Sequence, residues 1–358
     1  VISDFRNIQL QELEFSPNVN CISGNNGEGK TNLLDAIYYL SMTKSAFATS
    51  DKFSFRHGTD EFSLSGSYRM ENGLLSRFAM KMTSKGEKKV RRDDKPYTKV
   101  SEHLGILPIV MVSPSDISMV SESGEERRRF VNSVLSQMDR EYLSALQHYN
   151  RLLLQRNRML KEADLDRSLL EVIDMRMATY AEPVFQARRT FVDELCPLVA
   201  EYYKAISGGS EHVDIMYDSE LSKASLDMLL EASYDKDRVL KYTSSGVQRD
   251  DFIFMMNGHP IRRCGSQGQQ KSFLVALKFA QYEIMKRKYG FAPILLLDDV
   301  FDKLDMGRIS NLLQMVASND FGQIFITDSN KVRMSGIVDK LTRDRAYFDT
   351  FQGTFTRI

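Results

Sequence analysis

The chain has 358 residues, of which 42% are hydrophobic and 27% charged, and its formal net charge is zero. These values fit a folded protein of two or three domains. The neutral total gives no sign of a nucleic-acid partner, so any contact with DNA requires a local basic surface, or one that forms only on dimerisation. Three cysteines without a C-x-x-C pair favour the cytoplasm and argue against a structural zinc site. No apolar run approaches the ~18 residues of a membrane-spanning helix, so we expect no membrane partner.

The first 42 residues predict strands, a turn and a helix. Residues 4–13 and 18–22 are rich in apolar β-formers and are typical of strands. Residues 31–42 carry apolar side chains at helical spacing. The chain opens with Val1 inside a predicted strand, so we expect a few residues to precede it. A glycine-rich turn therefore lies between a strand and a helix.

That turn matches the phosphate-loop motif G-x-x-x-x-G-K-[ST] in full. It consists of Gly24, Asn25, Asn26, Gly27, Glu28, Gly29, Lys30 and Thr31. Its glycines allow backbone N–H groups to curl around phosphate oxygens. Lys30 would place a positive charge on the β- and γ-phosphates, and the Thr31 hydroxyl would bind Mg²⁺. The motif predicts that the chain binds ATP with Mg²⁺, but it does not say how the energy is used.

The middle of the chain changes from strands to helices. Residues 53–100 alternate short strand patterns with polar turns, which predicts an antiparallel sheet, and residues 107–112 predict a further strand. Residues 125–203 hold few strand signals. Between Val131 and Leu153, apolar residues recur every three or four positions, which predicts one long amphipathic helix.

Two prolines interrupt the later helical part. Pro183 and Pro197 indicate helix starts or kinks there. We therefore divide the chain into a first part of an ATPase domain, a helical insertion and a second part of the ATPase domain. These parts cover residues 1–120, 121–210 and 211–358.

Residues 264–271 form a second glycine turn, which precedes another predicted helix. The Ser266 hydroxyl and the backbone N–H of Gly268 can form a second anion site at the helix N-terminus. One chain has a single phosphate loop, so a second anion-binding turn suggests a nucleotide held between two copies of the protein. The alternative is an ordinary helix cap by Ser266 or Ser272. The position of this turn, 28 residues before Asp298 (298 minus 270), favours the first interpretation.

Residues 294–299 form an apolar run that ends in two acids. A buried strand with acids at its carboxyl end is where α/β sheets place their chemistry. Asp298 fits the acid associated with Mg²⁺, and Asp299 fits the group that orients or deprotonates the attacking water. The alternative is a strand followed by an acidic turn. Lys30 lies 268 residues before Asp298 (298 minus 30), which indicates a large insertion between two halves of one ATPase core.

Together these motifs resemble the ATPase heads of the ABC and SMC proteins, and essentially the whole chain is similar to the RecF family of bacterial replication and repair proteins. The matching segments are residues 5–7, 23–38, 113–116, 126–130, 246–251 and 265–270. The resemblance implies an α/β fold, an ABC/SMC-like P-loop ATPase head of mixed sheets and flanking helices that carries an inserted helical domain. It also implies a weak ATPase that DNA stimulates.

The resemblance implies roles for further residues. In the ATP site, the phosphate loop would be joined by Arg6, Asn7 and Asn32. The alternative for Arg6 and Asn7 is a strand end with exposed polar side chains. In the signature turn, the γ-phosphate held by a partner subunit would be contacted by Ser266, Gly268, Gln269 and Gln270. Asp305 would lie in a D-loop that crosses the dimer interface.

The resemblance further implies an ATP-dependent homodimer that clamps duplex DNA near single-strand gaps and at single-strand/double-strand junctions. It would act with RecO and RecR to load RecA recombinase in DNA repair, recombination, replication and the SOS response. Two alternatives stay open: an ABC transporter subunit, and a nucleotide-gated scaffold with negligible hydrolysis. Against a transporter, residues 326–329 lack the switch histidine, so Thr327 or Asp328 would replace it. Asp299, where many ABC proteins have Glu, makes slow hydrolysis plausible.

Basic clusters give candidates for a DNA surface. Those that we predict to contact the DNA backbone are Lys88, Lys89 and Arg91 on an expected hairpin, and Arg151, Arg156 and Arg158 on an expected helix. The alternative for each cluster is a solvated face. Residues 127–129, three consecutive arginines, could instead be structural and oppose Glu125 and Glu126.

Overall fold

The structure, a computed structural model, describes residues 1–122, 124–209, 211–302, 304–318, 321–330 and 344–358. Its contacts divide the chain into two compact units. Unit 1 consists of Val1–Asp116, Ala205–Gly208 and Lys278–Ile358, and unit 2 of Ile117–Lys204 and Gly209–Leu277. None of the helices in the described ranges is long and apolar enough to cross a membrane.

These units differ from the division that the sequence suggests at residues 120 and 210. Residues 211–277 group with the helices of unit 2, because the strand Val213–Asp218 pairs with Asp251–Met256 and the latter contacts the helix Gly124–Met138. Ser210, the predicted end of the helical insertion, lies outside the described residues.

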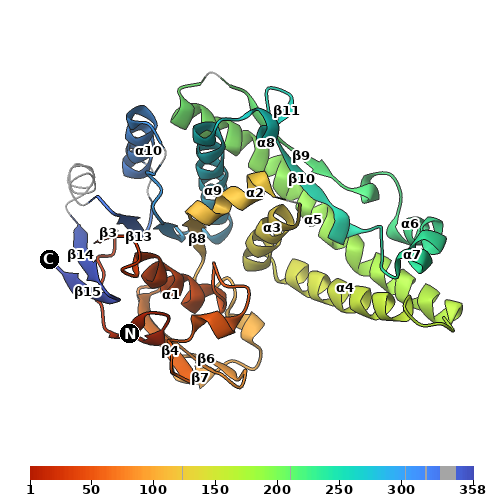
Figure 1. Ribbon diagram of the computed structural model, residues 1–358, viewed down its shortest axis with the longest axis horizontal. Coiled ribbons are helices and arrows are strands. Elements are labelled where there is room, and N and C mark those ends of the chain that lie inside the picture. The colour runs from red at the N-terminus through yellow and green to blue at the C-terminus, as the bar shows by residue number, and fades with distance from the viewer. Residues whose placement is uncertain (123, 210, 303, 319–320, 331–343) are drawn as a thin grey trace. The chain divides into compact units, whose positions relative to one another are not determined.

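Unit 1 contains two six-stranded sheets and short helices (Figure 1). Its elements are β1 (Ile2–Phe5), β2 (Ile8–Gln11), β3 (Val19–Ser23), α1 (Lys30–Met42), β4 (Glu61–Arg69), β5 (Leu75–Thr83), β6 (Lys88–Arg92), β7 (Lys95–Pro96), β8 (Ile109–Val112), β12 (Ile294–Leu297), α10 (Met306–Ser318), β13 (Ile324–Asp328), β14 (Arg345–Phe351) and β15 (Thr354–Arg357).

One sheet is antiparallel, in the order β2-β1-β4-β5-β6-β7, as the sequence predicts for residues 53–100. The other has the order β15-β14-β3-β13-β12-β8 and is parallel except for β15. Because β3, β13 and β12 are adjacent and parallel, their carboxyl ends lie at one edge, where open α/β sheets bind ligands. That edge therefore carries the phosphate loop and the acidic pair.

Helix α1 explains how the two sheets share one core. It contacts β1, β4 and β5 of the antiparallel sheet and β8 and β13 of the parallel sheet. Ten of its 13 residues are buried, so the helix is buried on nearly all sides rather than on one face only. The start of α1, immediately after the phosphate loop, is thereby fixed by packing on both sides.

Unit 2 contains long helices and a small antiparallel sheet in the order β11-β10-β9. Its elements are α2 (Ser118–Ser121), α3 (Gly124–Met138), α4 (Arg140–Met159), α5 (Arg167–Ser207), β9 (Val213–Asp218), α6 (Leu226–Ala232), α7 (Tyr234–Leu240), β10 (Asp251–Met256), β11 (His259–Pro260), α8 (Ile261–Cys264) and α9 (Gln267–Tyr289). By residue number, the end of α5 from Ala205 and the second half of α9 from Lys278 belong to unit 1.

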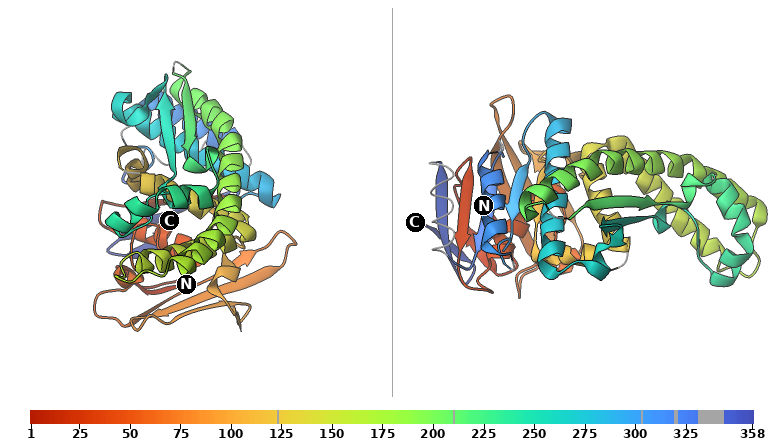
Figure 2. Two further views of the ribbon diagram at one scale, coloured as in Figure 1. Left: turned by 90° about the vertical axis from the view of Figure 1, so that its right-hand side faces the viewer. Right: turned by 90° about the horizontal axis from the view of Figure 1, so that it is seen from above.

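The helices of unit 2 correct one sequence prediction and decide between the two alternatives of another. The single helix expected through Val131 and Leu153 is two helices, because the Asp139 side chain accepts hydrogen bonds from the backbone N–H groups of Glu141 and Tyr142 and starts α4 there. Pro183 and Pro197 start no helix, since both lie inside the 41-residue α5. Figure 2 shows that α5 follows a curved path, as proline inside a helix favours.

Candidate nucleotide site and signature turn

The phosphate loop follows β3 and leads into α1, as its motif requires. Two of its positions leave no room for a side chain. A Cβ at Gly24 would lie 2.7 Å from the carbonyl oxygen of Thr350, and a Cβ at Gly29, whose φ is +111°, would lie 2.7 Å from the Asn7 side chain. Glycine is therefore needed here to let other segments approach the loop closely.

Lys30 points back into the loop. Its side chain is almost fully buried, and its Nζ donates hydrogen bonds to the carbonyl oxygens of Gly24 at 2.7 Å and Asn25 at 3.1 Å. These bonds place the ammonium group inside the curl of the backbone, where a bound phosphate would meet it.

Thr31 and Asp298 meet across the sheet edge. The Thr31 hydroxyl lies 3.0 and 2.9 Å from the two carboxylate oxygens of Asp298. Burial raises the pKa of Asp298, while hydrogen bonds from Thr327 and Thr31 oppose the rise. The pair presents a hydroxyl and a carboxylate, both oxygen ligands of the kind that Mg²⁺ prefers, so these residues fit the predicted metal.

Thr327 holds the acidic pair in place. From β13, its hydroxyl donates to Asp298 Oδ1 at 2.7 Å and accepts from the backbone N–H of Asp299 at 3.0 Å. The backbone of Asp299 has a positive φ of 43°, which orients the residue after the strand end. Of the two residues expected to replace the switch histidine, Thr327 contacts the acids, whereas Asp328 accepts a hydrogen bond from the Asn330 backbone.

Arg6, Asn7 and Asn32 lie beside the loop. The Arg6 guanidinium forms a 2.6 Å ion pair with buried Asp35 and a 3.2 Å hydrogen bond with the Asn32 side chain. Asn7 accepts a hydrogen bond from Asn32 at 2.8 Å and donates one to the carbonyl of Glu28 at 3.3 Å. The structure thus brings the three residues to the loop, and their contact with nucleotide stays a prediction.

The turn between β14 and β15 is a part of the site that sequence reasoning missed. The backbone N–H of Gln352 donates to the Glu28 carboxylate, and that of Gly353 donates to the Glu28 carbonyl at 2.8 Å. No local signal in the sequence predicts that this turn contacts the phosphate loop, because it lies more than 300 residues after the loop.

The signature turn closes on itself in unit 2. The backbone N–H of Ser266 donates to the Gln269 side chain at 2.8 Å, and the backbone N–H of Gln269 donates to the Ser266 hydroxyl at 3.3 Å. This reciprocal pair is a capping box at the start of α9. Gln270 donates to the carbonyl of Gly265 at 2.8 Å. Ser266 nevertheless stays exposed, so the helix cap and the predicted phosphate contact are compatible.

Gln269 and Asp305 have further partners within the chain. Gln269 donates to the Glu211 carboxylate at 2.6 Å, and Gly268 is half-buried in the first turn of α9. Asp305 caps α10 by accepting from the backbone N–H of Arg308 at 3.0 Å, and its own side chain is largely exposed. An exposed Asp305 is compatible with the predicted D-loop role.

Comparison with known proteins decides the family. The sequence profile described as "RecF/RecN/SMC N terminal domain" matches residues 1–346. "DNA replication and repair protein RecF" of Parabacteroides distasonis is 43% identical over 352 residues, which cover 98% of this chain and 96% of that protein. The protein of the same description from Bacteroides fragilis strain ATCC 25285 is 40% identical over 358 residues, which cover 100% and 97%. The chain belongs to the RecF family.

Solved structures agree with this assignment. The structure described as "recombination mediator protein RecF-ATP in RecFOR pathway" is 28% identical, with a TM-score of 0.90 and coverage of 100% of this chain and 96% of that one. An SMC head is only 14% identical, but its TM-score of 0.59 shows the same fold. Members of the RecF family are ATP-binding ATPases of the SMC type. The predicted family, α/β head fold and ATPase class are confirmed, and the transporter alternative is set aside.

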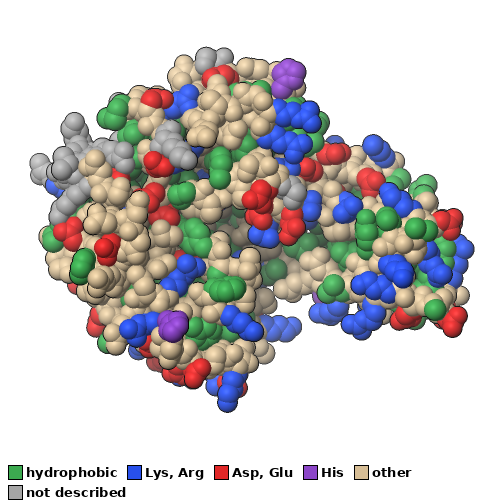
Figure 3. Space-filling view, viewed as in Figure 1, with side chains coloured by type: hydrophobic (Ala, Val, Ile, Leu, Met, Phe, Trp, Pro, Cys, Tyr) green, Lys and Arg blue, Asp and Glu red, His purple; other side chains and the backbone are tan. Residues whose placement is uncertain are grey.

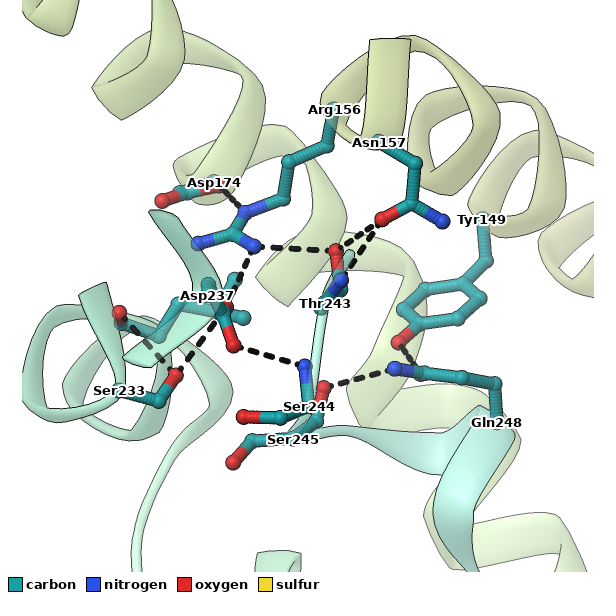
Figure 4. A network of polar contacts seen from close by, with 11 residues as sticks. Tyr149, Arg156, Asn157, Asp174, Ser233, Asp237, Thr243, Ser244, Ser245 and Gln248 are labelled. Carbon is teal, nitrogen blue, oxygen red and sulfur yellow. Dashed lines mark hydrogen bonds and ion pairs between the residues drawn. The ribbon is translucent and has the colours of Figure 1, made fainter. Parts of the chain in front are cut away.

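In this RecF-family chain, the prediction that Arg156 binds DNA is wrong. Its side chain is fully buried and forms 2.7 Å ion pairs with Asp174 and Asp237 and a 3.0 Å hydrogen bond with Thr243 (Figure 4). The arginine joins α4, α5 and the segment after α7 and cannot reach a ligand. Arg151 and Arg158, on the other faces of α4, are exposed.

The hairpin cluster divides in a similar way. Lys88 is only half-exposed, and its Nζ contacts Asp51 at 2.8 Å and the carbonyl of Thr43 at 2.8 Å, so its charge is already neutralised within the chain. Lys89 and Arg91 are exposed on the opposite face of β6. The structure therefore removes Lys88 from the predicted DNA surface and keeps the other two residues.

The three arginines of residues 127–129 have structural roles, the alternative that the sequence left open. Arg127 forms a bidentate pair with Asp251 at 2.8 and 2.9 Å. Arg129 pairs with Glu125 and Glu126 on its own helix. Arg128 donates a hydrogen bond to the carbonyl of Asp250 at 2.7 Å. The contacts of Arg127 and Arg128 hold α3 against the start of β10, whereas those of Arg129 stay within α3.

Proposed function

We propose that this chain binds Mg²⁺-ATP at its phosphate loop, dimerises when the signature turn of a second copy covers the nucleotide, and so clamps duplex DNA in recombinational repair and replication. The observation that carries the proposal is the cluster of Thr31, Asp298 and Thr327 beside buried Lys30. It provides the groups for triphosphate chemistry, whereas the exposed serine turn that would complete the site lies in the other compact unit.

The residues of the cluster have distinct tasks in hydrolysis. Lys30 would bind phosphate oxygens by charge, and Thr31 with Asp298 would hold Mg²⁺, which neutralises charge on the phosphates. Asp299 would orient the attacking water and accept its proton. Thr327 would fix both acids through its hydroxyl. Because an aspartate reaches less far than the glutamate of many ABC proteins, we expect slow turnover.

The outer face of the antiparallel sheet is the DNA surface that the geometry favours. Alternate residues of β4, β5 and β6 point to this face, and most of them are exposed. The exposed cations of this face are Arg69, Arg77, Lys81, Lys89 and Arg91. Lys81 and Lys89 are directly opposite in register. Glu61, which pairs with Lys81, is an acid on the same face. An extended basic face suits the phosphate backbone of a duplex rather than its bases.

The cellular task follows from the family. Relatives at about 40% identity are described as replication and repair proteins, and a related solved structure is described as a recombination mediator in the RecFOR pathway. We infer that this chain acts in the cytoplasm at single-strand gaps and single-strand/double-strand junctions. We further infer that it helps RecO and RecR to load RecA.

DNA stimulation of ATP turnover tests the function. We expect duplex or gapped DNA to raise the steady-state rate of phosphate release and ATP to tighten DNA binding, because only the closed dimer grips DNA. Asp299→Asn should bind ATP and DNA but release phosphate far more slowly. The proposal would be contradicted if DNA did not change the rate of phosphate release and ATP did not change the affinity for DNA.

A charge reversal locates the DNA surface. Lys89→Glu/Arg91→Glu should lower duplex affinity by about 10-fold or more and reduce the salt dependence of binding, since phosphate contacts are lost. Arg151→Glu/Arg158→Glu, on exposed positions of α4, is the matched comparison. If only the α4 variant weakens binding, the helical unit carries the DNA surface instead of the sheet.

A further inference from the structure

Two exposed arginines stand directly before the signature turn. Arg262 and Arg263 belong to the one-turn helix α8, and both side chains are exposed. No hydrogen bond, ion pair or ring contact joins either guanidinium to another of the described residues. Figure 3 shows Lys and Arg side chains gathered on the surface over α8 and β11. This differs from Arg127, Arg156 and Arg188, which unit 2 uses in ion pairs.

The backbone that carries these arginines is fixed relative to Ser266. Ile261 anchors α8 with a side chain that is 1% exposed. The backbone N–H of Gly265 donates to the Ile261 carbonyl at 2.8 Å, and a Cβ at Gly265 would lie 2.9 Å from that oxygen. The Gln270 side chain then bonds the Gly265 carbonyl at 2.8 Å. The short helix α8 and the signature turn are therefore held together by these bonds. The backbone of Arg262 and Arg263 is fixed, whereas their long side chains can move.

The charges around the phosphate loop call for a further cation. A bound triphosphate would add several negative charges to those of Asp298 and Asp299, and Lys30 is the cation inside the loop. Arg6 lies nearby, but its charge is matched by Asp35 at 2.6 Å. The residues of the signature turn expected to meet the phosphate, Ser266, Gly268, Gln269 and Gln270, contribute a hydroxyl, backbone N–H groups and amides, all of them neutral. Mg²⁺ and one lysine leave the site with an excess of negative charge.

We propose that Arg262 and Arg263 supply this charge in trans, by contacting the phosphates of the nucleotide bound at the phosphate loop of a second copy of the chain. The inference rests on the proposed function, because the arginines reach a phosphate only if the signature turn of one copy faces the loop of another. Guanidinium groups suit this task, since they bind phosphate oxygens in a bidentate manner. Because neither guanidinium has a partner among the residues that the structure describes, both are available for this contact.

Mixing two inactive variants tests the proposal. Arg262→Gln/Arg263→Gln alone should lower ATP turnover by about 10²-fold or more, as loss of a trans arginine does, while the isolated chain binds a fluorescent ATP analogue normally. Lys30→Ala alone should also be inactive. An equimolar mixture should recover turnover, because its mixed dimer contains one site built from an intact loop and intact arginines. Arg176→Gln/Arg189→Gln removes two exposed arginines elsewhere in unit 2 and should behave like the unchanged chain.

A parallel mixture separates this proposal from the proposed function. Ser266→Arg mixed with Lys30→Ala should also recover activity if the signature turn works in trans. Recovery with the Ser266 variant but not with the arginine variant would overturn the arginine proposal alone. No recovery in either mixture would overturn both. An arginine variant that dimerises and turns over ATP normally without DNA but binds duplex poorly would assign the two arginines to DNA, which also overturns the proposal.

Discussion

The two glycine turns of this chain are built in opposite ways. The phosphate loop depends on distant segments, because Asp298, Asn7 and the β14–β15 turn all contact it or the residue that follows it. The signature turn is closed by a reciprocal pair of its own residues, Ser266 and Gln269, and Gln269 also donates to Glu211 of the same unit. A loop that the rest of its unit holds in place can bind a ligand alone. An exposed turn that is closed largely by its own residues is suited to meet a ligand that another molecule brings.

The strongest long-range polar contacts of unit 2 lie away from the signature turn, in two buried ion pairs. Arg156 and Arg188 are both buried, and each pairs with a buried aspartate, Asp237 and Asp250 respectively. The Arg188 guanidinium also donates to the carbonyl of Val247 at 2.6 Å. These networks join the long helices to the segment between α7 and β10. They therefore stabilise unit 2, which carries the signature turn.

The largest effect should follow from loss of the loop cation. Lys30→Ala removes the charge that meets the phosphates, and we expect ATP turnover to fall by about 10²–10³-fold or more. The thermal midpoint should change little, because Lys30 bonds only two loop carbonyls. Equilibrium binding of ATP and single-turnover hydrolysis check this. Normal ATP binding by this variant would contradict the claim that the phosphate loop is the turn that binds ATP by itself.

Breaking a buried ion pair of unit 2 should lower the stability of the protein rather than its ATP turnover. Arg156→Ala leaves Asp237 buried without its cation, and we expect the free energy of unfolding to fall by about 3–5 kcal/mol. Arg158→Ala, at an exposed position of the same helix, is the control and should change it by about 0.5 kcal/mol or less. Urea denaturation measures both. Equal effects of the two substitutions would show that the buried network does not support the unit.

Thr327→Val tests how the acidic pair is positioned. The change removes the hydroxyl that bridges Asp298 and the Asp299 backbone, so we expect turnover to fall by about 10-fold while ATP affinity changes less. Thr327→Ser keeps the hydroxyl and should restore most of the rate. If valine and serine behave alike, the hydroxyl has no positioning role and packing alone fixes the acids.

The smallest effect on stability is expected for a substitution of Ser266. It tests separately the capping of α9 and the predicted contact with a phosphate in trans. Ser266→Asp keeps a good N-cap, so the stability of α9 should stay within about 0.5 kcal/mol of the unchanged chain. The added negative charge should nevertheless prevent ATP-dependent dimerisation, because it would face a phosphate. Amide hydrogen exchange at the start of α9 reports the cap, and gel filtration with ATP reports the dimer. Dimerisation of this variant would leave Ser266 with a capping role only.

Short-range patterns predicted much of the fold. Residues 31–42 gave α1 within one residue of its observed start, because apolar spacing and the preceding glycines are local signals. The strand that ends at the acidic pair was readable for the same reason. The break at Asp139 was missed, since the apolar spacing continues across it and only the side-chain cap marks the new helix.

The site was predictable only where a motif is contiguous. Arg156 and Arg158 look alike in the sequence, yet one is buried by partners 18 and 81 residues away and the other is exposed. The contact of Glu28 with the β14–β15 turn spans more than 300 residues. Such pairings depend on the completed fold, so neither periodicity nor residue type reveals them.

Sedimentation velocity of the Asp299→Asn chain, with and without Mg²⁺-ATP, tests the central claim most directly. The account predicts that ATP converts the chain to a dimer over an accessible concentration range, and that Lys30→Ala or Ser266→Arg introduced into the same background prevents this. A chain that stays monomeric with bound ATP at every concentration, or that dimerises regardless of Ser266, would contradict a nucleotide shared between two copies.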